Sequence, residues 1–433
     1  MPDDSTPLRA PVTDGPAAST APPPSILPPS VLPPSVLLVA MSYWPEPAGS
    51  APMMTDLATA FAAAGTDMTV LTARPNYPGQ AIYDGYADGA EDRRTVNGVR
   101  IERLLTIPPK GGGMRARLIH EGVLHAGFLA ARARGRVARH KAVLSLCPSI
   151  FSVAVADRFR APGGRHIAIV HDIQSGLAGA LGMGGGAALK AIQAIERTAL
   201  NRADGVVVLS EAMADVLRDL GVRRPITVIP PHVDSDAVRP LPRPEGQPPT
   251  VLYSGAFARK QGLDQVLEMA RHLHALRPDA RVLLRGQGGL EEELKAQAKA
   301  MALPNVEFAP LIASDRLAEG LAEGDVHLVP QRPEGAAFAM PGKAVTILAA
   351  GRPFVCTCLP GSALDRLGTE IDAFRRTPPD APEAMAQAVA DLLNDPARSA
   401  AMGRRGRAWV EGNASRSAVL ARYATLLLGN DDA

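Results

Sequence analysis

Short apolar runs alternate with longer stretches of helical period along most of this chain. An apolar run at residues 36–41 leads, through a loop rich in Pro, Gly and Ser, to a helical stretch from Met53 to Ala64 and a second apolar run at residues 68–72. Strands joined in this way through a helix pair side by side in a parallel sheet. The pattern therefore predicts a βαβ unit at the start of a doubly wound α/β domain.

The predicted strands fall into two series. The first continues at residues 142–146, 165–170 and 205–209, and the second comprises residues 251–254, 281–285, 306–308, 326–329 and 353–357. Between them, residues 230–249 are dense in proline and poor in apolar side chains, which indicates a linker. We predict an α/β protein with two doubly wound Rossmann-like domains that face one another across a cleft.

The same pattern gives the boundaries of these units. We expect a disordered tail at residues 1–34, an N-terminal domain at 35–235, a linker at 236–249, a C-terminal domain at 250–412 and a closing helical segment at 413–433. The tail is rich in Pro, Ala and Ser, and proline at this density favours an extended chain without a packed core. It lacks the basic region and unbroken apolar run of a secretory signal.

The length and composition of the chain agree with this organisation. A length of 433 residues exceeds what one hydrophobic core usually supports, which agrees with two domains. The formal net charge of +2 argues neither for nor against nucleic acid, and we expect no nucleic-acid partner. Three cysteines are too few for a disulfide framework, so we expect reduced thiols and a cytoplasmic protein. No stretch supplies the roughly 20 apolar residues of a membrane span.

Two glycine-rich loops follow predicted strands of the second domain. One runs from Gly255 to Gly262 and carries the adjacent cations Arg259 and Lys260, and the other spans residues 286–289. Both lie where parallel strands deliver their carboxyl ends, the edge at which α/β proteins bind ligands. Together they suggest a nucleotide diphosphate site, although each alone is also compatible with a tight turn and solvated surface cations.

Short motifs occur in a fixed order along the chain. They are Tyr43-Trp44-Pro45-Glu46-Pro47-Ala48-Gly49, Val70-Leu71-Thr72-Ala73-Arg74-Pro75-Asn76-Tyr77-Pro78, His171-Asp172-Ile173-Gln174, Tyr253-Ser254-Gly255 with Arg259-Lys260-Gln261-Gly262, Gly286-Gln287-Gly288, Leu303-Pro304-Asn305-Val306, and Pro341-Gly342-Lys343 running to Ala349-Ala350-Gly351. In this order and spacing they resemble the GT-B glycosyltransferases of the large retaining family four, most closely the colanic-acid and exopolysaccharide branch. The resemblance covers about residues 35 to 430.

The resemblance implies that the C-terminal domain holds a nucleotide-sugar donor and the N-terminal domain an acceptor, with the closing segment packed back on the N-terminal domain. It also implies that the leaving phosphate deprotonates the acceptor on the face it departs from, which retains the anomeric configuration. Negative charge growing on the phosphates requires cations and oriented backbone amides. The candidates for this role are Arg259, Lys260 and Lys343, with Gly255, Gly286, Gly288 and Gly342 giving the backbone close access.

In the N-terminal domain, the resemblance places His171 at the donor sugar with Asp172 beside it, and Gly49 and Ser50 near the donor phosphates and acceptor. Without the resemblance, a histidine after a strand is often structural, and an aspartate there often caps the next helix. We take His171, Asp172 and Lys343 as the catalytic candidates. No cofactor is expected, because the nucleotide sugar is a substrate.

The chain departs from the family pattern at two places. Many members have an arginine directly after the first glycine of the first loop and a lysine directly before its second, where this chain has Ala256 and Gln261. Many members also carry two glutamates at the positions of Phe338 and Thr346, so both carboxylates are absent here. The Pro-Gly-Lys sequence ending at Lys343 resembles instead the Pro-Ser-Lys variant of the exopolysaccharide branch.

Two further patterns carry no site. Asp234 and Asp236 have the spacing of a metal-bound sugar-nucleotide motif but lie in the linker, where polar turn residues are common. The glycines at positions 179, 182 and 184 are spaced roughly as in a dinucleotide fingerprint, but no fresh strand precedes them. We therefore expect neither a metal nor a nicotinamide cofactor.

Residues 110–141 carry a basic excess with interleaved apolar side chains. This suits a helix that lies on anionic lipid, and equally an ordinary domain helix that packs Leu and Phe inward. Because enzymes of the resembling branch act on sugars carried by polyprenyl diphosphate, we expect a lipid-linked or glycan acceptor. The same argument favours peripheral contact with the inner face of the cytoplasmic membrane.

Two other functions fit the sequence. A sugar-nucleotide epimerase can share the two-domain architecture and would convert its donor without an acceptor. A non-catalytic nucleotide-sugar-binding protein would fit the missing glutamates and would release no free nucleotide. Neither accounts for the basic segment as naturally as a glycosyltransferase of surface polysaccharide assembly.

Overall fold

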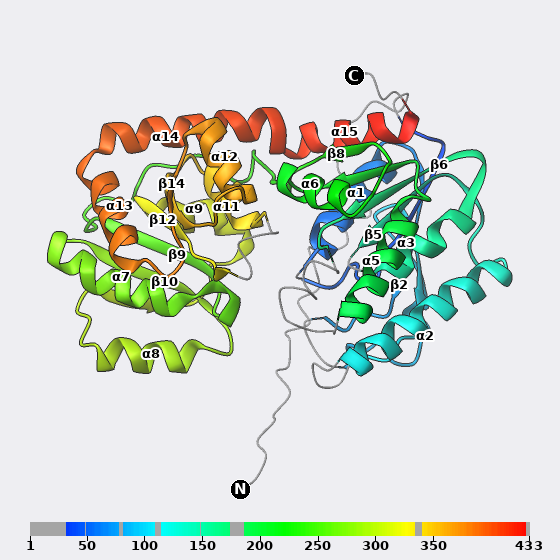
Figure 1. The fold of residues 1–433 in the computed structure, drawn as a ribbon, viewed down its shortest axis with the longest axis horizontal. Helices are drawn as coiled ribbons and strands as arrows, with labels where there is room; N and C mark the ends of the chain where they lie inside the picture. Colours follow the sequence, from blue (N-terminus) through cyan, green and yellow to red (C-terminus); the bar gives the residue numbers. More distant parts are fainter. Residues whose placement is uncertain are drawn as a thin grey trace, which may run out of the picture.

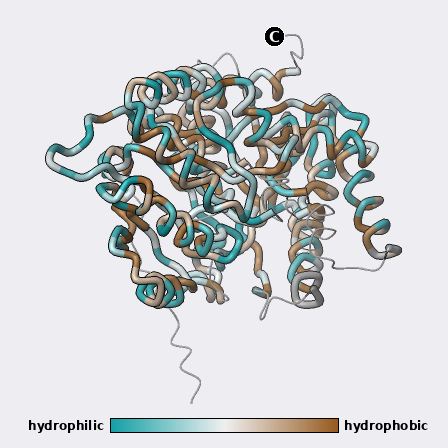
Figure 2. The backbone as a smooth tube through the Cα atoms, turned by 60° about the vertical axis from the view of Figure 1, so that its left-hand side comes forward, coloured by the Kyte–Doolittle hydropathy of each residue, from teal (hydrophilic) through white to brown (hydrophobic). Residues whose placement is uncertain are grey.

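The computed structural model describes residues 32–47, 49–77, 81–108, 114–147, 149–173, 186–333 and 340–429. Two α/β lobes lie side by side, and helices cover a sheet in each (Figure 1). Apolar segments concentrate inside the lobes, whereas many outer loops are hydrophilic (Figure 2). The predicted fold class, two doubly wound Rossmann-like domains, is confirmed.

The N-terminal domain is built on an eight-stranded sheet in the order β3-β4-β2-β1-β5-β6-β7-β8, parallel except for the pair β3 and β4. Its strands are β1 (Ser35–Val39), β2 (Asp67–Ala73), β3 (Arg93–Val96), β4 (Val99–Leu104), β5 (His140–Cys147), β6 (Arg160–Val170), β7 (Gly205–Val208) and β8 (Ile226–Val228). Its helices are α1 (Ala51–Ala63), α2 (Met114–Ala133), α3 (Ile150–Ala156), α5 (Gly186–Leu200) and α6 (Glu211–Asp219). The central strands are apolar runs because helices cover both faces.

The C-terminal domain is built on a six-stranded parallel sheet in the order β11-β10-β9-β12-β13-β14. Its strands are β9 (Thr250–Ala256), β10 (Arg281–Gln287), β11 (Val306–Ala309), β12 (Val326–Val329), β13 (Phe354–Thr357) and β14 (Arg375–Thr377). Its helices are α7 (Leu263–Leu276), α8 (Glu291–Ala300), α9 (Leu317–Ala322), α11 (Gly342–Ala349), α12 (Ala363–Ile371), α13 (Pro382–Asn394) and α14 (Pro396–Trp409).

In both sheets, the order in which strands are added reverses next to the first strand. In the N-terminal sheet the chain adds β2 and β4 on one side of β1 and then β5 on the other side. In the C-terminal sheet it adds β10 and β11 on one side of β9 and then β12 on the other. A crevice forms at the carboxyl ends of strands where the order reverses. The loops after β1 and β9 therefore begin at the two places where a doubly wound sheet binds ligands.

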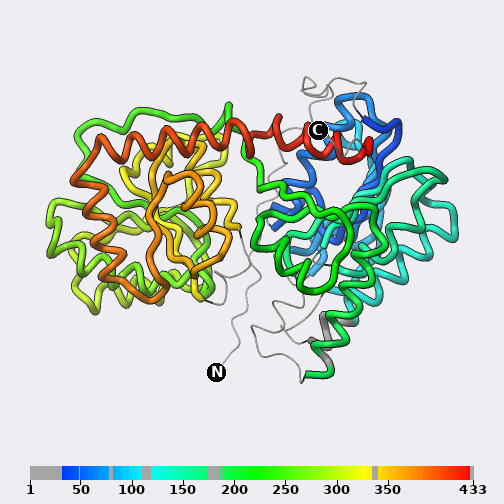
Figure 3. The backbone as a smooth tube through the Cα atoms, turned by 45° about the horizontal axis from the view of Figure 1, so that its top comes forward, coloured from blue at the N-terminus to red at the C-terminus, as the bar shows by residue number. Residues whose placement is uncertain are grey.

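The last helix, α15 (Arg416–Leu428), packs on the N-terminal domain although it follows the whole C-terminal domain in sequence (Figure 3). Val419, Leu420 and Tyr423 are buried in one cluster with Val36 and Leu38 of β1. A π-helical turn (Val410–Ala414) separates α15 from α14, and Ser415 caps α15 by accepting a hydrogen bond from the backbone N–H of Ala418. The chain thus crosses between the domains twice.

The packed N-terminal domain begins three residues before the predicted boundary. Leu32 is buried in the core, and the backbone oxygens of Pro33 and Pro34 accept hydrogen bonds from the Thr66 hydroxyl (3.3 Å) and the Asp67 N–H (3.1 Å). Residues 1–31, which make up the rest of the predicted tail, lie outside the described residues.

Helix α2 covers much of the basic segment at residues 110–141. Leu124 and Phe128 are buried with Val143 and Phe159, so this part of its apolar face packs inward as in an ordinary domain helix. Ile119 is half exposed. Among the residues described, none of the helices combines the length and apolarity needed to traverse a bilayer.

Candidate active site

Lys343 lies at the start of α11 and reaches the carboxyl end of β9. Its Nζ lies 3.1 Å from the Tyr253 hydroxyl and 3.1 Å from Gln261 Oε1, and the ammonium stands 4.3 Å from the centre of the Tyr253 ring. Gly255 makes room for this side chain, because a Cβ at that position would lie 3.0 Å from Nζ. The structure thus brings together Lys343 and Gly255, two of the residues predicted to bind the diphosphate.

The ammonium of Lys343 has no anionic partner within the described residues, since both of its hydrogen-bond acceptors are neutral. Burial, together with the nearby charge of Lys260, lowers the pKa of Lys343 to about 7. Lys343 is partly buried, and a cation that is shielded from water without a counter-ion is costly in a folded protein. Such a group in a crevice is a candidate for binding an anionic ligand.

Lys260 and Arg259 lie on the short helical turn Arg259–Gln261, and both are exposed. In the part of the chain that the structure describes, neither has an ion pair or a side-chain hydrogen bond. Lys260 is close enough to act on the pKa of Lys343, whereas Arg259 is not among the charges that do so. Of the three predicted cations, the structure therefore couples Lys343 and Lys260.

Gln261 occupies the position at which many family members have a lysine. Its amide oxygen accepts the hydrogen bond from Lys343 Nζ, which an ammonium at position 261 would repel. The cation missing from the loop is therefore supplied from α11. Sequence reasoning treated Gln261 only as a departure and did not identify Tyr253 as the second partner.

The predicted glycines of the second loop have a structural reason of their own. A Cβ at Gly286 would overlap the carbonyl oxygen of Gly255, and a Cβ at Gly288 would lie 2.5 Å from the carbonyl oxygen of Phe257. The loops after β9 and β10 thus pack backbone against backbone. Gly342, by contrast, has open space around it at the first position of α11. Contact of these glycines with a nucleotide stays a prediction.

Ser50 and His171 meet on the N-terminal side. Ser50 Oγ and His171 Nδ1 share a hydrogen bond of 2.7 Å across the ends of β1 and β6. Ser50 is the N-cap residue of α1 but makes no side-chain cap, and its hydroxyl bonds the imidazole instead. Gly49 precedes it with a φ of +68°, a turn conformation that favours glycine.

The imidazole of His171 is neutral at physiological pH, because burial, together with the nearby His232, lowers its pKa to about 4. Its Nε2 is buried and has no hydrogen-bond partner among the described residues. A neutral imidazole with one free nitrogen can bind a sugar hydroxyl. Asp172, the weaker candidate, follows at an exposed position, and its backbone oxygen accepts a hydrogen bond from Cys147 Sγ.

Glu46 joins the first two motifs. Its Oε1 accepts hydrogen bonds from the backbone N–H groups of Asn76 (2.7 Å) and Tyr77 (2.9 Å), while Oε2 is buried without a partner in the described structure. Burial raises the pKa of Glu46 against the opposing effect of these two bonds. The carboxylate holds the loops after β1 and β2 together. The sequence showed both motifs but not this link.

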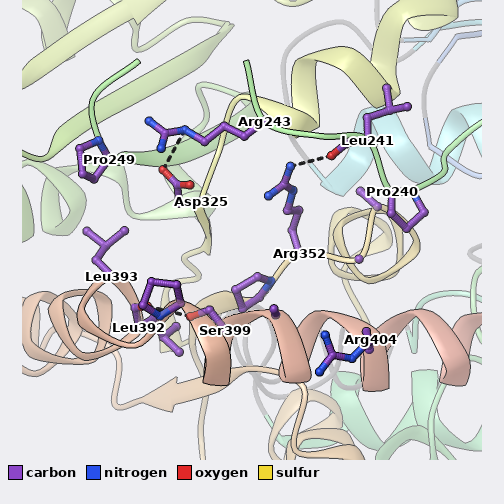
Figure 4. A pocket seen from close by; sticks show the side chains of 15 residues that line it. Pro240, Leu241, Arg243, Pro249, Asp325, Arg352, Leu392, Leu393, Ser399 and Arg404 are labelled. Carbon is purple, nitrogen blue, oxygen red and sulfur yellow. Dashed lines mark hydrogen bonds and ion pairs between the residues drawn. The ribbon is translucent and has the colours of Figure 1, made fainter. Parts of the chain in front are cut away.

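A cavity of about 480 Å³ lies between the linker and the C-terminal domain (Figure 4). Arg352 donates a hydrogen bond to the Leu241 backbone oxygen (2.9 Å), and Arg243 pairs with Asp325 (3.4 Å), so these cations hold the linker in place. None of the predicted site residues lines this cavity.

The described residues contain no group of three or more His, Cys, Asp or Glu side chains that could hold a metal ion. Asp234 Oδ1 accepts hydrogen bonds from the backbone N–H groups of Asp236 and Ala237, which is the turn role expected in a linker. The glycines at positions 179, 182 and 184 lie outside the described residues.

Two Rossmann-like domains with their crevices at the ends of β1 and β9 make up a GT-B fold, and the family models that match the two domains identify the protein as a GT-B glycosyltransferase. Residues 48–232 match the family model "Glycosyl transferase 4-like domain" and residues 248–395 match "Glycosyl transferases group 1". The chain belongs to the family-four glycosyltransferases and resembles their colanic-acid branch.

Individual relatives agree with this assignment. The chain is 28% identical over 358 residues to the putative colanic acid biosynthesis glycosyl transferase WcaI of Escherichia coli, which covers 78% of this chain and 86% of the relative. It is 30% identical over 261 residues to a GDP-mannose-dependent alpha-(1-6)-phosphatidylinositol monomannoside mannosyltransferase of Mycolicibacterium smegmatis. That match covers 55% of this chain and 67% of the relative. The solved sucrose-phosphate synthase of Thermosynechococcus elongatus superposes with a TM-score of 0.70 at 19% identity, covering 90% of this chain and 98% of that one.

Proposed function

We propose that the protein transfers a sugar from a nucleotide-sugar donor to a lipid-linked glycan acceptor during assembly of a bacterial exopolysaccharide or other surface polysaccharide. The transfer retains the anomeric configuration and needs no metal. The C-terminal domain binds the donor through its diphosphate, and the N-terminal domain binds the acceptor.

The observation that carries this proposal is the ammonium of the partly buried Lys343, which has no counter-ion among the residues that the structure describes. Lys343 lies in the first turn of α11, and Lys260 adds a second positive charge. Cations and helix N-terminal amides together suit a diphosphate. Their attraction grows as the diphosphate leaves the sugar, because the leaving oxygen gains negative charge at that moment.

His171 supplies the matching half of the proposed site. Its free Nε2 binds a hydroxyl of the donor sugar and holds the ring while the bond between the anomeric carbon and the phosphate oxygen breaks. The acceptor hydroxyl attacks from the same face and gives its proton to the leaving phosphate oxygen. Negative charge develops on the diphosphate, where Lys343 and Lys260 stand, and the positive charge that the anomeric carbon gains in return is neutralised by the incoming acceptor oxygen. Because the leaving phosphate oxygen takes the acceptor proton, no carboxylate base is required.

Two relatives support the choice of substrates. One is named for colanic acid biosynthesis, and the other is named for GDP-mannose and a phosphatidylinositol monomannoside acceptor. A nucleotide-sugar donor and a lipid-borne acceptor are therefore the substrate classes that we propose for this chain.

Exposed apolar side chains support a peripheral membrane contact that would give access to such an acceptor. Leu105, Ile107 and Ile119 are exposed by 60, 51 and 50%. The Ile107 backbone oxygen lies 2.8 Å from Nδ1 of His120, the neighbour of Ile119, so these side chains share one end of the domain. We place the membrane contact at this apolar group rather than along all of α2, whose Leu124 and Phe128 are buried.

The first test is a thermal-shift titration with UDP, GDP and their sugars, followed by a transfer assay with the nucleotide that binds. A ligand that binds the folded state alone raises the melting temperature. We expect Lys343→Met to abolish the shift and Lys299→Met, which removes an exposed lysine of α8, to keep it. If neither nucleotide stabilises the wild type, or if Lys343→Met binds it normally, the proposed donor site is wrong.

The membrane contact is tested separately by flotation with vesicles of phosphatidylglycerol and phosphatidylcholine. We expect the double variant Ile107→Ser and Ile119→Ser to lose binding. Leu276→Ser, at an exposed apolar position of the other domain (46% exposed), should bind like the wild type. Equal flotation of all three proteins would contradict this contact.

A further inference from the structure

The two crossings between the domains are joined to each other. Val233, in the segment that leads from β8 into the linker, donates its backbone N–H to the Ala414 oxygen (3.0 Å), and its own oxygen accepts from the Arg416 N–H (3.0 Å). The first crossing and the turn before α15 thus pair through one parallel β-bridge, which we call the hinge.

One carboxylate on α1 binds both strands of this hinge. Asp56 accepts a hydrogen bond from His232 Nε2 (2.9 Å) on the first crossing, and Arg416 Nε on the second reaches both of its oxygens (2.8 and 2.7 Å). Burial by itself would raise the pKa of Asp56, but hydrogen bonds and charge from His232 and Arg416 outweigh it and leave the pKa below its usual range. The carboxylate is therefore ionised at neutral pH, and it pairs with Arg416.

The same helix leads to the proposed sugar-binding imidazole. Asp56 lies in the second turn of α1, and Ser50 at the start of this helix bonds His171. Helix α1 thus contacts the hinge through Asp56 and His171 through Ser50. Because a helix is rigid, a shift of one end moves the other, so α1 fixes the position of the hinge relative to the imidazole.

We infer that Asp56 is a positioning residue for the transfer reaction, fixing the hinge to α1 so that the donor held by the C-terminal domain arrives at His171. This inference rests on the proposed function, because it requires the donor and His171 to come from opposite domains. Asp56 touches no predicted donor group, so its loss should leave donor binding intact. Misplacing reacting groups by about 1 Å can cost roughly 100-fold in rate, and kcat should therefore suffer.

The test compares Asp56→Asn with Asp215→Asn. Asp215 also forms an ion pair between the domains, with Arg366 (2.6 Å), but it lies away from the hinge and is exposed. We expect Asp56→Asn to lower kcat about 10- to 100-fold, with the dissociation constant and binding stoichiometry of the nucleoside diphosphate unchanged. Asp215→Asn should stay within about twofold, as exposed pairs contribute little.

A double-variant cycle separates positioning from a general loss of structure. Arg416→Gln should lower kcat as Asp56→Asn does, and the two together should be no worse than the more severe single variant, because both break one link. His232→Gln, which can still donate a hydrogen bond to Asp56, should retain more activity than either. If kcat falls only in proportion to the binding stoichiometry, or if Asp56→Asn stays within twofold of the wild type, the inference is wrong.

Measuring the distance between the two domains tests the role of the hinge independently of enzyme activity. The three native cysteines are buried, so Ala133→Cys at the end of α2 and Ala296→Cys on α8, both exposed, can be labelled for single-molecule energy transfer. In the wild-type background we expect one narrow distance distribution, and in Asp56→Asn a broad one. This comparison needs no ligand, so it stands if the proposed donor site fails. An unchanged distribution overturns the hinge role.

Discussion

The two halves of the proposed site differ in charge, because one presents cations and the other a neutral imidazole. On the C-terminal side, Lys343 and Lys260 have no anionic partner among the described residues, although Lys343 is partly buried. On the N-terminal side, His171 is buried in its neutral form and bonds the hydroxyl of Ser50. The difference indicates a division of labour, in which one domain meets the changing charge of the diphosphate and the other fixes the uncharged sugar.

The largest effect that we predict on this comparison comes from the neutral half. The amide nitrogen of an asparagine sits near the place of imidazole Nδ1, and that of a glutamine near Nε2. His171→Asn should therefore keep the Ser50 bond but lose the group facing the sugar, and kcat should fall about 100-fold, as when one oriented donor is removed. His171→Gln should lose much less. Steady-state kinetics with saturating donor measure both, and equal loss in the two variants would refute the role of Nε2.

The second prediction concerns the backbone contact on which the charged half depends. Gly286→Ala should lower the free energy of unfolding by about 2 kcal/mol, because its Cβ has no space beside the Gly255 oxygen. Gly289→Ala is the matched control, with nothing within 4 Å of its Cβ, and should be nearly neutral. Urea unfolding of the two variants decides the point. If Gly286→Ala is as stable as the control, the loops do not pack as described.

A third prediction follows from the pKa of Lys343 and concerns donor affinity. Diphosphate binding favours the ammonium, so the pKa of Lys343 rises in the complex above its value of about 7 in the free protein. Affinity should be complete below pH 7 and fall by up to tenfold per pH unit above it. Isothermal titration from pH 6 to 9 measures the slope. Lys343→Arg, which stays protonated, should show a flat profile, and the idea fails if both proteins give the same curve.

The smallest effect distinguishes the two exposed cations. Lys260 lowers the pKa of Lys343, so Lys260→Ala should raise it and move the alkaline loss of affinity to higher pH. Arg259→Ala should leave this pH profile in place, because Arg259 does not act on Lys343. Both variants should bind the diphosphate only a few-fold more weakly at pH 7, as exposed charges are screened. Identical profiles for the two variants would remove the distinction between them.

The sequence predicted the strands of the two sheet centres well, because they are continuous apolar runs bounded by glycine or proline. It missed β14, which reads Arg-Arg-Thr, and β3 and β8, which are short and polar or only partly apolar. It also missed β4, in which charged and apolar residues alternate. Their pairing depends on neighbours that local pattern does not reveal.

Within the site, sequence reasoning found Lys260 because it lies in a glycine loop after a strand, and it found Lys343, Ser50 and His171 through the family resemblance. It could not find the acceptors of the Lys343 ammonium, since Tyr253 and Gln261 lie about 80 to 90 positions away. Nor could it find Asp56, whose partner Arg416 lies 360 residues further along the chain. Contacts of this kind depend on tertiary packing and leave no periodic signal.

The return of α15 to the N-terminal domain affects how the protein is made. Val419, Leu420 and Tyr423 complete the core around β1, yet they leave the ribosome only after the entire C-terminal domain has been synthesised. The first domain therefore keeps an apolar groove open beside its central strand until α15 has been synthesised. A chain that stops before α15 would have a whole C-terminal domain and an N-terminal domain without part of its interior.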